Sequence, residues 1–375
     1  MMSQPAKHSF TRRSFGRVAV LAVAWQTAAF GAASAIAEAG QSNQCWSEAM
    51  LSHKSGDERI RRNVAGALVT PPQDQGAPLK PAAEMMPGAI RRVELPPGSK
   101  KLVALTFDLC EQRNEVTGYQ GEIVDFLRAQ NVKATFFAGG KWLLTHAERG
   151  QQLMSDPLFE VGSHSWEHRN LRVVSDAALA QEIGAPQLAY RQLRADLELK
   201  HCARAGAKGF AHERAPRSIA LFRFPYGACD AKSLRAVAER GLSAIQWDVS
   251  AGDPWIGATA PSMVLSVLSH VRPGSIVIFH ANGRGVHTSG ALPQIVATLK
   301  QRGYEFVTVS ELLRAGKPVV EGRCYDAKPG DTDRYDAVGR RTEERYAGRI
   351  KRIDKGGDAS AGNPRSGWEA WPEPN

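Results

Sequence analysis

The stretch KLVALTFDLC, residues 101–110, decides the fold, because it is typical of a buried strand that ends in a charged residue. The run from Leu102 to Phe107 is almost entirely apolar and has the length of a single strand. Asp108 follows this run directly, which places its carboxylate at a strand end. Side chains at strand ends carry the chemistry in α/β barrels. Asp108 is therefore the first candidate for a functional residue.

A second stretch, HSWEH at residues 164–168, spaces two histidines four residues apart. On a helical turn, His164 and His168 would point the same way and reach one metal ion. Together with a carboxylate at a strand end, two such histidines predict a metal site that activates water. Two histidines at this spacing also occur by chance in a chain that has ten. The neighbouring blocks of sequence favour the metal site.

Strand-like and helix-like segments alternate from residue 101 to residue 314. This alternation predicts an α/β fold with a parallel sheet, and the number of units predicts a distorted (β/α) barrel of about seven strands. The predicted strands are residues 101–108, 133–138, 159–162, 218–224, 242–249, 276–280 and 305–308. The predicted helices are residues 121–130, 141–154, 176–199, 231–240, 263–270, 292–302 and 309–314. Polar residues at or just after the strand ends are Asp108, Arg223, Asp248 and His280.

These blocks, in this order, resemble those of the NodB-homology polysaccharide deacetylases, carbohydrate esterase family 4. That family has a T-F-D-D block, an H-[ST]-x-x-H block, an R-x-P-Y-G block, an Asp-Trp block and a hydrophobic strand that ends in His. The matching residues here are Thr106-Phe107-Asp108, His164-Ser165 with His168, Arg223 with Pro225-Tyr226-Gly227, Asp253 with Trp255, and Ser275 to His280. The resemblance covers about residues 96–315. It implies a metal-dependent hydrolase that removes N-acetyl groups from an amino-sugar polysaccharide or oligosaccharide of the cell envelope.

The first block departs from the family pattern, because it reads TFDLC rather than T-F-D-D. The family's second aspartate is a metal ligand, and Leu109 stands in its place with a side chain that cannot bind a cation. Asp108 turned toward the metal, Cys110 as a thiolate, or Glu111 are the alternatives for a third protein ligand. For Cys110 a buried thiol or a disulfide is also expected, and for Glu111 a solvated side chain. The implied ion is Zn²⁺, with Co²⁺ or Ni²⁺ as alternatives.

Residue chemistry and the resemblance together assign roles around this ion. Asp108 would take a proton from water as general base, and His280 would protonate the leaving sugar amine. The backbone N–H of Tyr226 would stabilise the oxyanion, as the family implies. Trp255 and Ile278 would form an apolar pocket for the acetyl methyl group.

A charged pair is expected behind the general base. Arg223, paired with Asp253, would hold Asp108 in place. Pro254 is inserted between the aspartate and the tryptophan of the family's block, so Asp248 is an alternative partner for this arginine.

The N-terminus predicts export. Residues 11–15, TRRSF, form a twin-arginine pattern, and an apolar stretch from Val18 to Ala37 follows. Small residues at 35, 37 and 39 suit a cleavage site. We therefore expect residues 1–39 to be a signal peptide for the twin-arginine export machinery, and the protein to be periplasmic or secreted without a stable membrane span. An uncleaved anchor is the alternative reading.

Composition fits one large domain with two less regular flanks. The 375 residues are 43% hydrophobic and carry a formal charge of +10, part of it in the signal peptide. No basic run interleaved with aromatic residues indicates nucleic-acid binding. Residues 40–95, rich in proline, predict an extended arm before the domain at residues 96–320, and residues 321–375 predict a loose, charged tail. Trp368 and Trp371 in that tail could dock on the barrel or on a glycan.

An oxidising compartment favours disulfides among the cysteines. The five cysteines are Cys45, Cys110, Cys202, Cys229 and Cys324. Because Cys110 and Cys229 both follow candidate site blocks, a bridge between them is one hypothesis.

Two rival functions remain at this point. The first is a hydrolase of the same fold that acts without metal, on another C–N bond or on O-acetyl esters. The second is an envelope protein that binds glycan without catalysis. The joint presence of Asp108, His164, His168, Arg223 and His280 favours catalysis over both.

Overall fold

The computed structural model describes residues 45–73, 88–200 and 215–353, all within one compact unit, Asn43–Asn375. The predicted signal peptide and the two C-terminal tryptophans lie outside these ranges. None of the helices in the described ranges is long and apolar enough to cross a bilayer.

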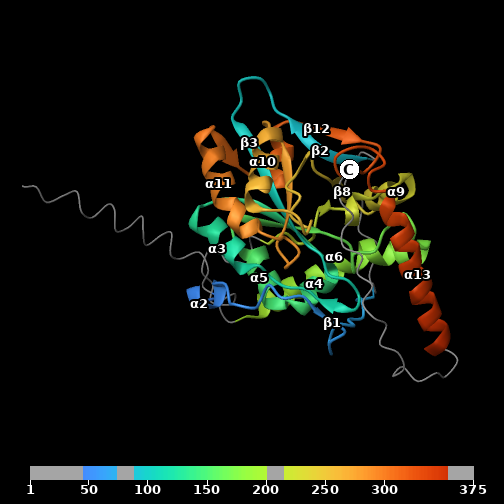
Figure 1. Cartoon of the computed structure of the whole chain (residues 1–375). Helices are drawn as coiled ribbons and strands as arrows, with labels where there is room; N and C mark the ends of the chain where they lie inside the picture. The colour runs from blue at the N-terminus through green and yellow to red at the C-terminus, as the bar shows by residue number, and fades with distance from the viewer. Residues whose placement is uncertain (1–44, 74–87, 201–214, 354–375) are drawn as a thin grey trace, which may run out of the picture. The chain divides into compact units, whose positions relative to one another are not determined.

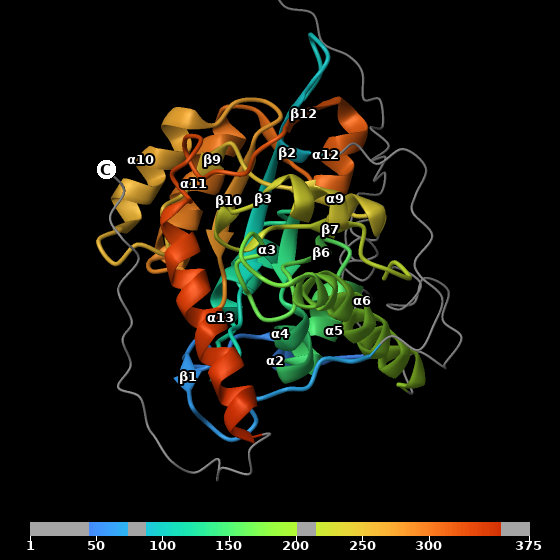
Figure 2. The same cartoon turned by 90° about the vertical axis from the view of Figure 1, so that its right-hand side faces the viewer.

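A ten-stranded sheet forms the centre of this unit (Figures 1 and 2). Its strand order is β12-β2-β8-β7-β6-β5-β3-β10-β9, and β11 pairs with β3 beside that path. The strands are β2 (Ala89–Glu94), β3 (Lys101–Leu109), β5 (Ala134–Ala138), β6 (Phe159–Ser163), β7 (Leu221–Phe222), β8 (Ser243–Ile245), β9 (Val249–Ser250), β10 (Ile276–His280), β11 (Tyr304–Phe306) and β12 (Lys317–Glu321). All these pairs are parallel except β12 with β2, which is antiparallel.

The sheet is strongly curled, because one stretch of chain pairs with strands near both of its ends. Strands β8 and β9 belong to one stretch of chain, residues 243–250; β8 pairs with β7 and β2, whereas β9 pairs with β10. Residue Arg92 of β2 also bridges to Ser275, just before β10. Counting β8 and β9 as one stretch, seven strands surround the interior. The predicted distorted (β/α) barrel of about seven strands is confirmed.

Alternation along β3 divides its side chains between two environments. Phe107 points outward and packs with Phe136 and Phe279 in the core that the sheet shares with the surrounding helices. Because side chains alternate along a strand, Thr106 and Asp108 point to the barrel interior. The parallel register places His280 of β10 directly beside Asp108. This register brings two candidate site residues, far apart in sequence, to one edge of the sheet.

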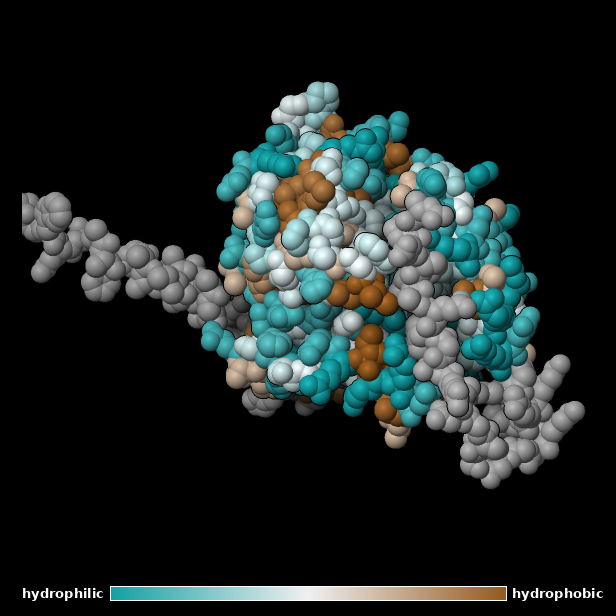
Figure 3. Space-filling view, in the orientation of Figure 1, coloured by the Kyte–Doolittle hydropathy of each residue, from teal (hydrophilic) through white to brown (hydrophobic). Residues whose placement is uncertain are grey.

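Helices cover the outside of the sheet, as in other parallel sheets buried on both faces (Figure 2). The helices of the described residues are α2 (Glu48–Leu51), α3 (Gly121–Ala129), α4 (Gly140–Thr145), α5 (Ala147–Ser155), α6 (Asp176–Leu199), the 3₁₀ turn η1 (Pro225–Gly227), α9 (Ala231–Glu239), α10 (Ala260–His270), α11 (Thr288–Gln301), α12 (Val309–Ala315) and α13 (Arg334–Ile353), of which η1 and α13 lie at the cleft described below. A small ribbon of β1 (Arg61–Arg62) and β4 (Glu115–Val116) lies apart from the main sheet. The face shown in Figure 3 is mostly hydrophilic with small hydrophobic patches.

The predicted N-terminal arm differs from the structure at its end. Residues 89–94 form β2, an integral strand whose Ala89 and Val93 are fully buried, so the barrel begins before residue 96. Earlier in this arm, residues 48–51 form the single helical turn α2. The prolines around β2 predicted an irregular segment. In the structure, Pro96 and Pro97 follow the end of β2 and do not interrupt it.

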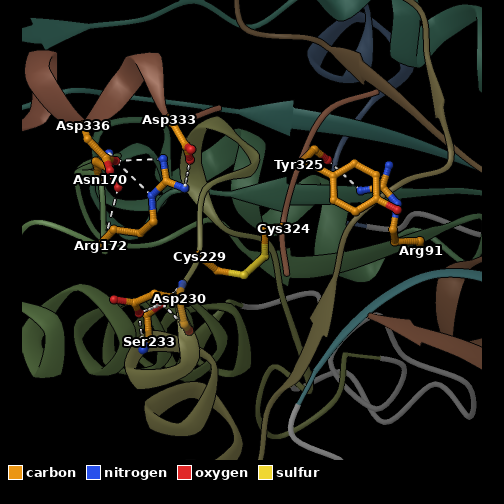
Figure 4. Close-up of a disulfide and its surroundings, with 10 residues drawn as sticks. All are labelled: Arg91, Asn170, Arg172, Cys229, Asp230, Ser233, Cys324, Tyr325, Asp333 and Asp336. Atoms are coloured by element: carbon orange, nitrogen blue, oxygen red, sulfur yellow. Dashed lines mark hydrogen bonds and ion pairs between the residues drawn. A yellow bond between two sulfur atoms is a disulfide. The ribbon is translucent and has the colours of Figure 1, made fainter. Parts of the chain in front are cut away.

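The predicted loose tail also differs from the structure over residues 321–353. Strand β12 ends at Glu321, a disulfide joins Cys324 to Cys229, and α13 follows (Figures 1 and 4). A covalent bond and ion pairs hold this region, rather than an aliphatic core, which is why its composition suggested a loose segment. The hypothesis of a Cys110–Cys229 bridge is wrong, because Cys110 is a free, buried thiol. Cys45 is also disulfide-bonded.

A buried carboxylate joins the long helix α6 to the loop that holds both candidate histidines. One oxygen of Glu182 accepts hydrogen bonds from the backbone N–H groups of Trp166 and Glu167, at 3.1 Å each. Burial, and then the charge of Glu167, raises the pKa of Glu182 to about 7. The folded state therefore favours the protonated form of this side chain.

We predict that Glu182→Gln flattens the pH dependence of stability. A raised folded pKa gives stability that is complete below the unfolded value of 4.5 and declines until the pH passes about 7. That shift corresponds to roughly 3 kcal/mol lost by the wild type at alkaline pH. The amide keeps an acceptor for the two N–H groups but does not ionise. Urea denaturation between pH 4 and pH 9 should show a smaller decline for Glu182→Gln, and an equal decline would contradict this role.

Candidate functional site

The candidate site lies where strand ends converge at one edge of the barrel. Asp108 and His280 lie at the ends of β3 and β10, His164 follows β6 and Arg223 follows β7. A cleft open to solvent lies at this edge. Residues lining it include Asp108, His164, His168, Tyr226, Trp247, Asp253, Trp255, Ile278, His280, Asp326, Arg334 and Tyr335. The convergence predicted from strand ends is therefore present.

Arg223 is fully buried and holds the predicted base directly. Its guanidinium donates to Asp108 Oδ1 and to the Thr106 hydroxyl at 2.8 Å each. It also donates, at 3.3 Å, to the backbone carbonyls of Ile245 and Gln246 at the end of the neighbouring strand β8. Charge-assisted bonds of this kind are shorter and stronger than neutral ones. One oxygen of Asp108 is thus occupied, and the other faces His164 Nε2 at 3.5 Å.

Asp253 pairs with His280 rather than with Arg223, so its predicted partner was wrong. Asp253 Oδ1 lies 3.0 Å from His280 Nδ1, and Oδ2 accepts hydrogen bonds from the His280 backbone N–H and the Thr288 hydroxyl. Burial alone would lower the pKa of His280, but the adjacent Asp253 carboxylate outweighs it and raises that pKa well above the ordinary value. The pair keeps a protonated imidazole in the cleft.

Asp248 lies outside the cleft, and the alternative that gave it to Arg223 was wrong. Its carboxylate accepts hydrogen bonds from the Ser275 hydroxyl and the Ile276 backbone N–H, and pairs with Arg272 at 3.4 Å. Asp248 therefore stabilises the start of β10, whereas the candidate site lies at the other end of that strand.

The two histidines meet on a loop, not on the helical turn that their spacing suggested. Ser165 and His168 both have positive φ, 63° and 58°, which bends the chain tightly after β6. The rings of His164 and His168 lie 4.9 Å apart between centroids. The two histidines come together as predicted, but through a tight loop rather than a helical turn.

Two buried ring nitrogens fit a metal ion. His164 Nδ1 bonds to the backbone carbonyl of Arg223 at 3.0 Å, which leaves Nε2 for the cleft. Within the described ranges, His164 Nε2 and His168 Nδ1 are buried without a hydrogen-bond partner. Histidines that bind metal commonly donate their other N–H to a carbonyl in this manner. Because buried polar atoms are normally paired, these two nitrogens are candidate ligands for a metal ion.

Cys110 completes a group of three donors. One ligand atom each from Cys110, His164 and His168 lies within 4.8 Å of the other two, and all three residues are buried. Burial alone would raise the pKa of the Cys110 thiol, but the charges of His168 and His164 outweigh it and lower that pKa well below its usual value. A thiolate with two imidazoles is a donor set that suits zinc, with a fourth position left for water or substrate.

The side chains of Leu109 and Glu111 are not part of this donor group. Leu109 is fully buried in the core between the sheet and its helices. Glu111 pairs with Lys141 at 3.1 Å and accepts hydrogen bonds from Thr117 and Thr145. Side chains two residues apart in an extended chain share a face, so Cys110 follows Asp108 toward the interior. This alternation is the signal that could have singled out Cys110 from the sequence.

Tyr226 lies beside the donor group in a strained backbone conformation. Its φ is 61°, which is uncommon for a residue with a side chain and is often found at functional sites. Its ring packs edge-on against His168, with centroids 4.5 Å apart. Trp255 and Ile278 line the same cleft, together with Trp247. The roles of Tyr226 at the oxyanion, and of Trp255 and Ile278 at the methyl group, stay predictions. Trp247 was not among the residues predicted from the sequence.

Comparison with known proteins identifies the family. Residues 96–245 match the sequence family described as polysaccharide deacetylase. A peptidoglycan-N-acetylglucosamine deacetylase of Bacillus cereus is 30% identical over 227 residues, 59% of this chain and 71% of that protein. A peptidoglycan-N-acetylglucosamine deacetylase of Listeria monocytogenes is 29% identical over 244 residues, 64% of this chain; the chain spans only 44% of that relative's length.

Solved structures give similar coverage. A peptidoglycan N-acetylglucosamine deacetylase superposes with a TM-score of 0.48 at 26% identity, over 60% of this chain and 93% of that one. A carbohydrate esterase family 4 pseudoenzyme from Bacillus anthracis superposes with a TM-score of 0.48 at 22% identity, over 62% of this chain and 71% of that one. The sequence match to the B. cereus relative confirms the resemblance of the five blocks, and the chain belongs to the polysaccharide deacetylase family.

Proposed function

We propose that the protein is a metal-dependent hydrolase that removes N-acetyl groups from an amino-sugar glycan of the cell envelope. This proposal rests on the meeting of Asp108 with three candidate metal donors on one side of a cleft and the His280–Asp253 pair on the other. The named activities of the relatives, on peptidoglycan N-acetylglucosamine and, for a Rhizobium leguminosarum relative, on chitooligosaccharide, support an N-acetylated glycan as substrate.

A divalent cation, Zn²⁺ or alternatively Co²⁺ or Ni²⁺, would be held by His164, His168 and Cys110. Such an ion supplies Lewis-acid polarisation and lowers the pKa of bound water to about 7. The unpartnered nitrogens of the two histidines and the depressed pKa of the Cys110 thiol fit this assignment. A thiolate here takes the place of the carboxylate that the family uses.

The protein's own groups then divide the proton transfers. Asp108, fixed by Arg223 through one oxygen, presents the other to the cleft and takes the proton of the attacking water. His280, kept protonated by Asp253, gives a proton to the amine so that it leaves neutral. The Tyr226 backbone N–H would stabilise the charge that develops on the carbonyl oxygen. Trp255 and Ile278 would hold the methyl group.

Export belongs to the same proposal. The twin-arginine pattern in residues 11–15 and the apolar stretch that follows suggest delivery of the folded protein by the twin-arginine machinery to the periplasm or the exterior. The Cys229–Cys324 disulfide and the bonded Cys45 suit an oxidising compartment. A glycan of the envelope is the polymer that this location would offer.

Acetate release tests the function itself. We expect the purified protein to release acetate from at least one of peptidoglycan, poly-N-acetylglucosamine and chitin oligomers, and to lose this activity after chelation. Zn²⁺ or Co²⁺ added back should restore it. Activity that survives complete metal removal would favour the metal-independent rival, and release only from O-acetyl esters would favour an esterase.

The third ligand has a spectroscopic test. Cobalt-substituted wild-type protein should show a sulfur-to-cobalt charge-transfer band, because the Cys110 thiolate binds the ion directly. Cys110→Ser should lose that band, whereas His164→Ala should lose most of the bound metal and all activity. Metal content is measured alongside by atomic emission. A band of unchanged intensity in Cys110→Ser would contradict this ligand assignment.

The role of His280 separates two kinds of substrate. His280→Ala should keep its metal but slow amide cleavage by about 10²- to 10⁴-fold, the usual contribution of a general acid. An activated acetate ester, whose leaving group needs no proton, should be affected far less. Steady-state rates on both substrates make the comparison. Equal losses would show that His280 is not the acid.

A further inference from the structure

One side of the cleft is built by residues that follow the barrel in sequence. Asp326, Arg334 and Tyr335 line the cleft together with Asp108 and His168. They belong to the stretch from Cys324 to Tyr346, which we call the C-terminal segment. It comprises a loop and the first part of α13. The proposed mechanism uses none of these residues.

The loop of the C-terminal segment is fixed to the barrel at its start. The disulfide ties Cys324 to Cys229, two residues beyond the end of η1 (Figure 4). Arg91 of β2 donates to the backbone carbonyls of Tyr325 and Asp326 at 2.6 and 2.7 Å, and its guanidinium stacks 3.7 Å from the Tyr325 ring. Asp326 in turn accepts from the Trp247 indole at 2.9 Å. The loop is thus held by a covalent bond, three hydrogen bonds and one cation–π contact.

The beginning of α13 is fixed to the loop that carries the histidines. Arg172 bonds to Asp333, to Asp336 and to the backbone carbonyl of Thr332, at distances of 2.8 to 2.9 Å (Figure 4). Asn170 donates to Asp336 at 2.8 Å. Several charges in one network hold a surface contact better than an isolated pair does.

Further along, α13 reaches the loops that follow both ligand blocks. Arg169, next to His168, pairs with Glu343 at 2.8 Å through its Nε. The Tyr346 ring packs beneath two guanidinium groups, those of Arg113 and Arg169, at 4.8 and 5.6 Å. Arg113 lies three residues after Cys110. The helix therefore braces the two loops that supply the metal donors.

Aromatic rings connect this helix to the site. Tyr335, which is 9% exposed, stacks on Tyr226 with ring centroids 5.0 Å apart and planes inclined by 29°. Tyr226 packs against His168 on its other side. Tyr335 is thus a ring that both lines the cleft and packs against Tyr226.

We infer that the C-terminal segment is a fixed wall of the substrate cleft, and that Tyr335 forms a subsite for the sugar beside the reacting residue. This inference rests on the proposed function. The Arg334 guanidinium lies over the Tyr335 ring, 5.0 Å from its centroid, and donates to the Tyr335 hydroxyl. The exposed part of this pair therefore offers the cleft an aromatic surface and a charged group, which suits an amphipathic ligand such as a pyranose ring. The substrate class is accordingly an oligosaccharide or polysaccharide of at least two sugars.

Tyr335→Ala tests the subsite, with Val338→Ala as the matched control on an exposed position of the same helix. For an N-acetylated chitooligosaccharide, Tyr335→Ala should raise KM about tenfold, the effect of losing one aromatic stacking contact. For a small activated acetate ester, kcat/KM should stay within about twofold of the wild type. Val338→Ala should match the wild type on both substrates. If Tyr335→Ala does not fold, Tyr335→Leu keeps volume without an aromatic face, and the same split is expected.

Two results would overturn the subsite. Equal losses on oligosaccharide and ester would show that Tyr335 acts only by holding Tyr226 and His168. An unchanged KM for the oligosaccharide would show that the wall does not touch the sugar.

Calorimetric titration separates this inference from the proposed function. If the wild type releases no acetate but binds the chitooligosaccharide about tenfold more tightly than Tyr335→Ala does, the subsite stands and the deacetylase assignment fails. Equal affinities of the two proteins would overturn the subsite whatever their activity.

Discussion

The geometry of the site depends on one buried guanidinium. Arg223 is fully buried, and its donors reach Thr106 and Asp108 on β3 and two carbonyls at the end of β8. Its own backbone carbonyl binds His164. A buried charge without partners costs several kcal/mol, and here each of the three guanidinium nitrogens has an acceptor. The predicted base and one metal donor are therefore positioned by the same residue.

A second constraint explains how a family site tolerates a missing carboxylate. In the extended chain after β3, Leu109 turns outward into the core, whereas Cys110 turns inward with Asp108. The thiol enters the space between two imidazoles, whose charges favour its ionised form. The site thus keeps three donors while exchanging a carboxylate for a softer thiolate, which favours zinc over magnesium or calcium. In the proposed mechanism, the substitution would change one metal ligand and leave the base in place.

The C-terminal segment completes the cleft by means that differ from those of the barrel. The barrel is held by apolar side chains on both faces of its strands, and the segment by a disulfide, stacked rings and charged pairs. Such contacts suit a position at the edge of a site, where side chains must be exposed to substrate. They also tie the segment to the loops that follow Cys110 and His168, so the proposed sugar subsite and the proposed metal site would share one support.

Hydrophobic patterning predicted the buried parts of this molecule well. The strands ending at Asp108 and His280, and helices α3, α6 and α9, lie within a residue or two of their expected positions. Interactions between distant residues were not predictable: the Asp253–His280 pair, the Cys229–Cys324 bond and the anchoring of α13 each depend on tertiary contacts that leave no local pattern. Strand β2 was not predicted, because the prolines around it are typical of an irregular segment. The loop of His164 and His168 was predicted as a helical turn, because the two histidines have the spacing of a helix.

Anomalous diffraction above the zinc edge, from crystals grown with Zn²⁺, tests the central claim most directly. The account predicts one peak bonded to Cys110 Sγ at about 2.3 Å and to nitrogens of His164 and His168 at about 2.0–2.1 Å. Asp108 should stand beside this peak while still bonded to Arg223. A peak bound by Asp108 and the histidines without Cys110, or no peak at these residues, would contradict it.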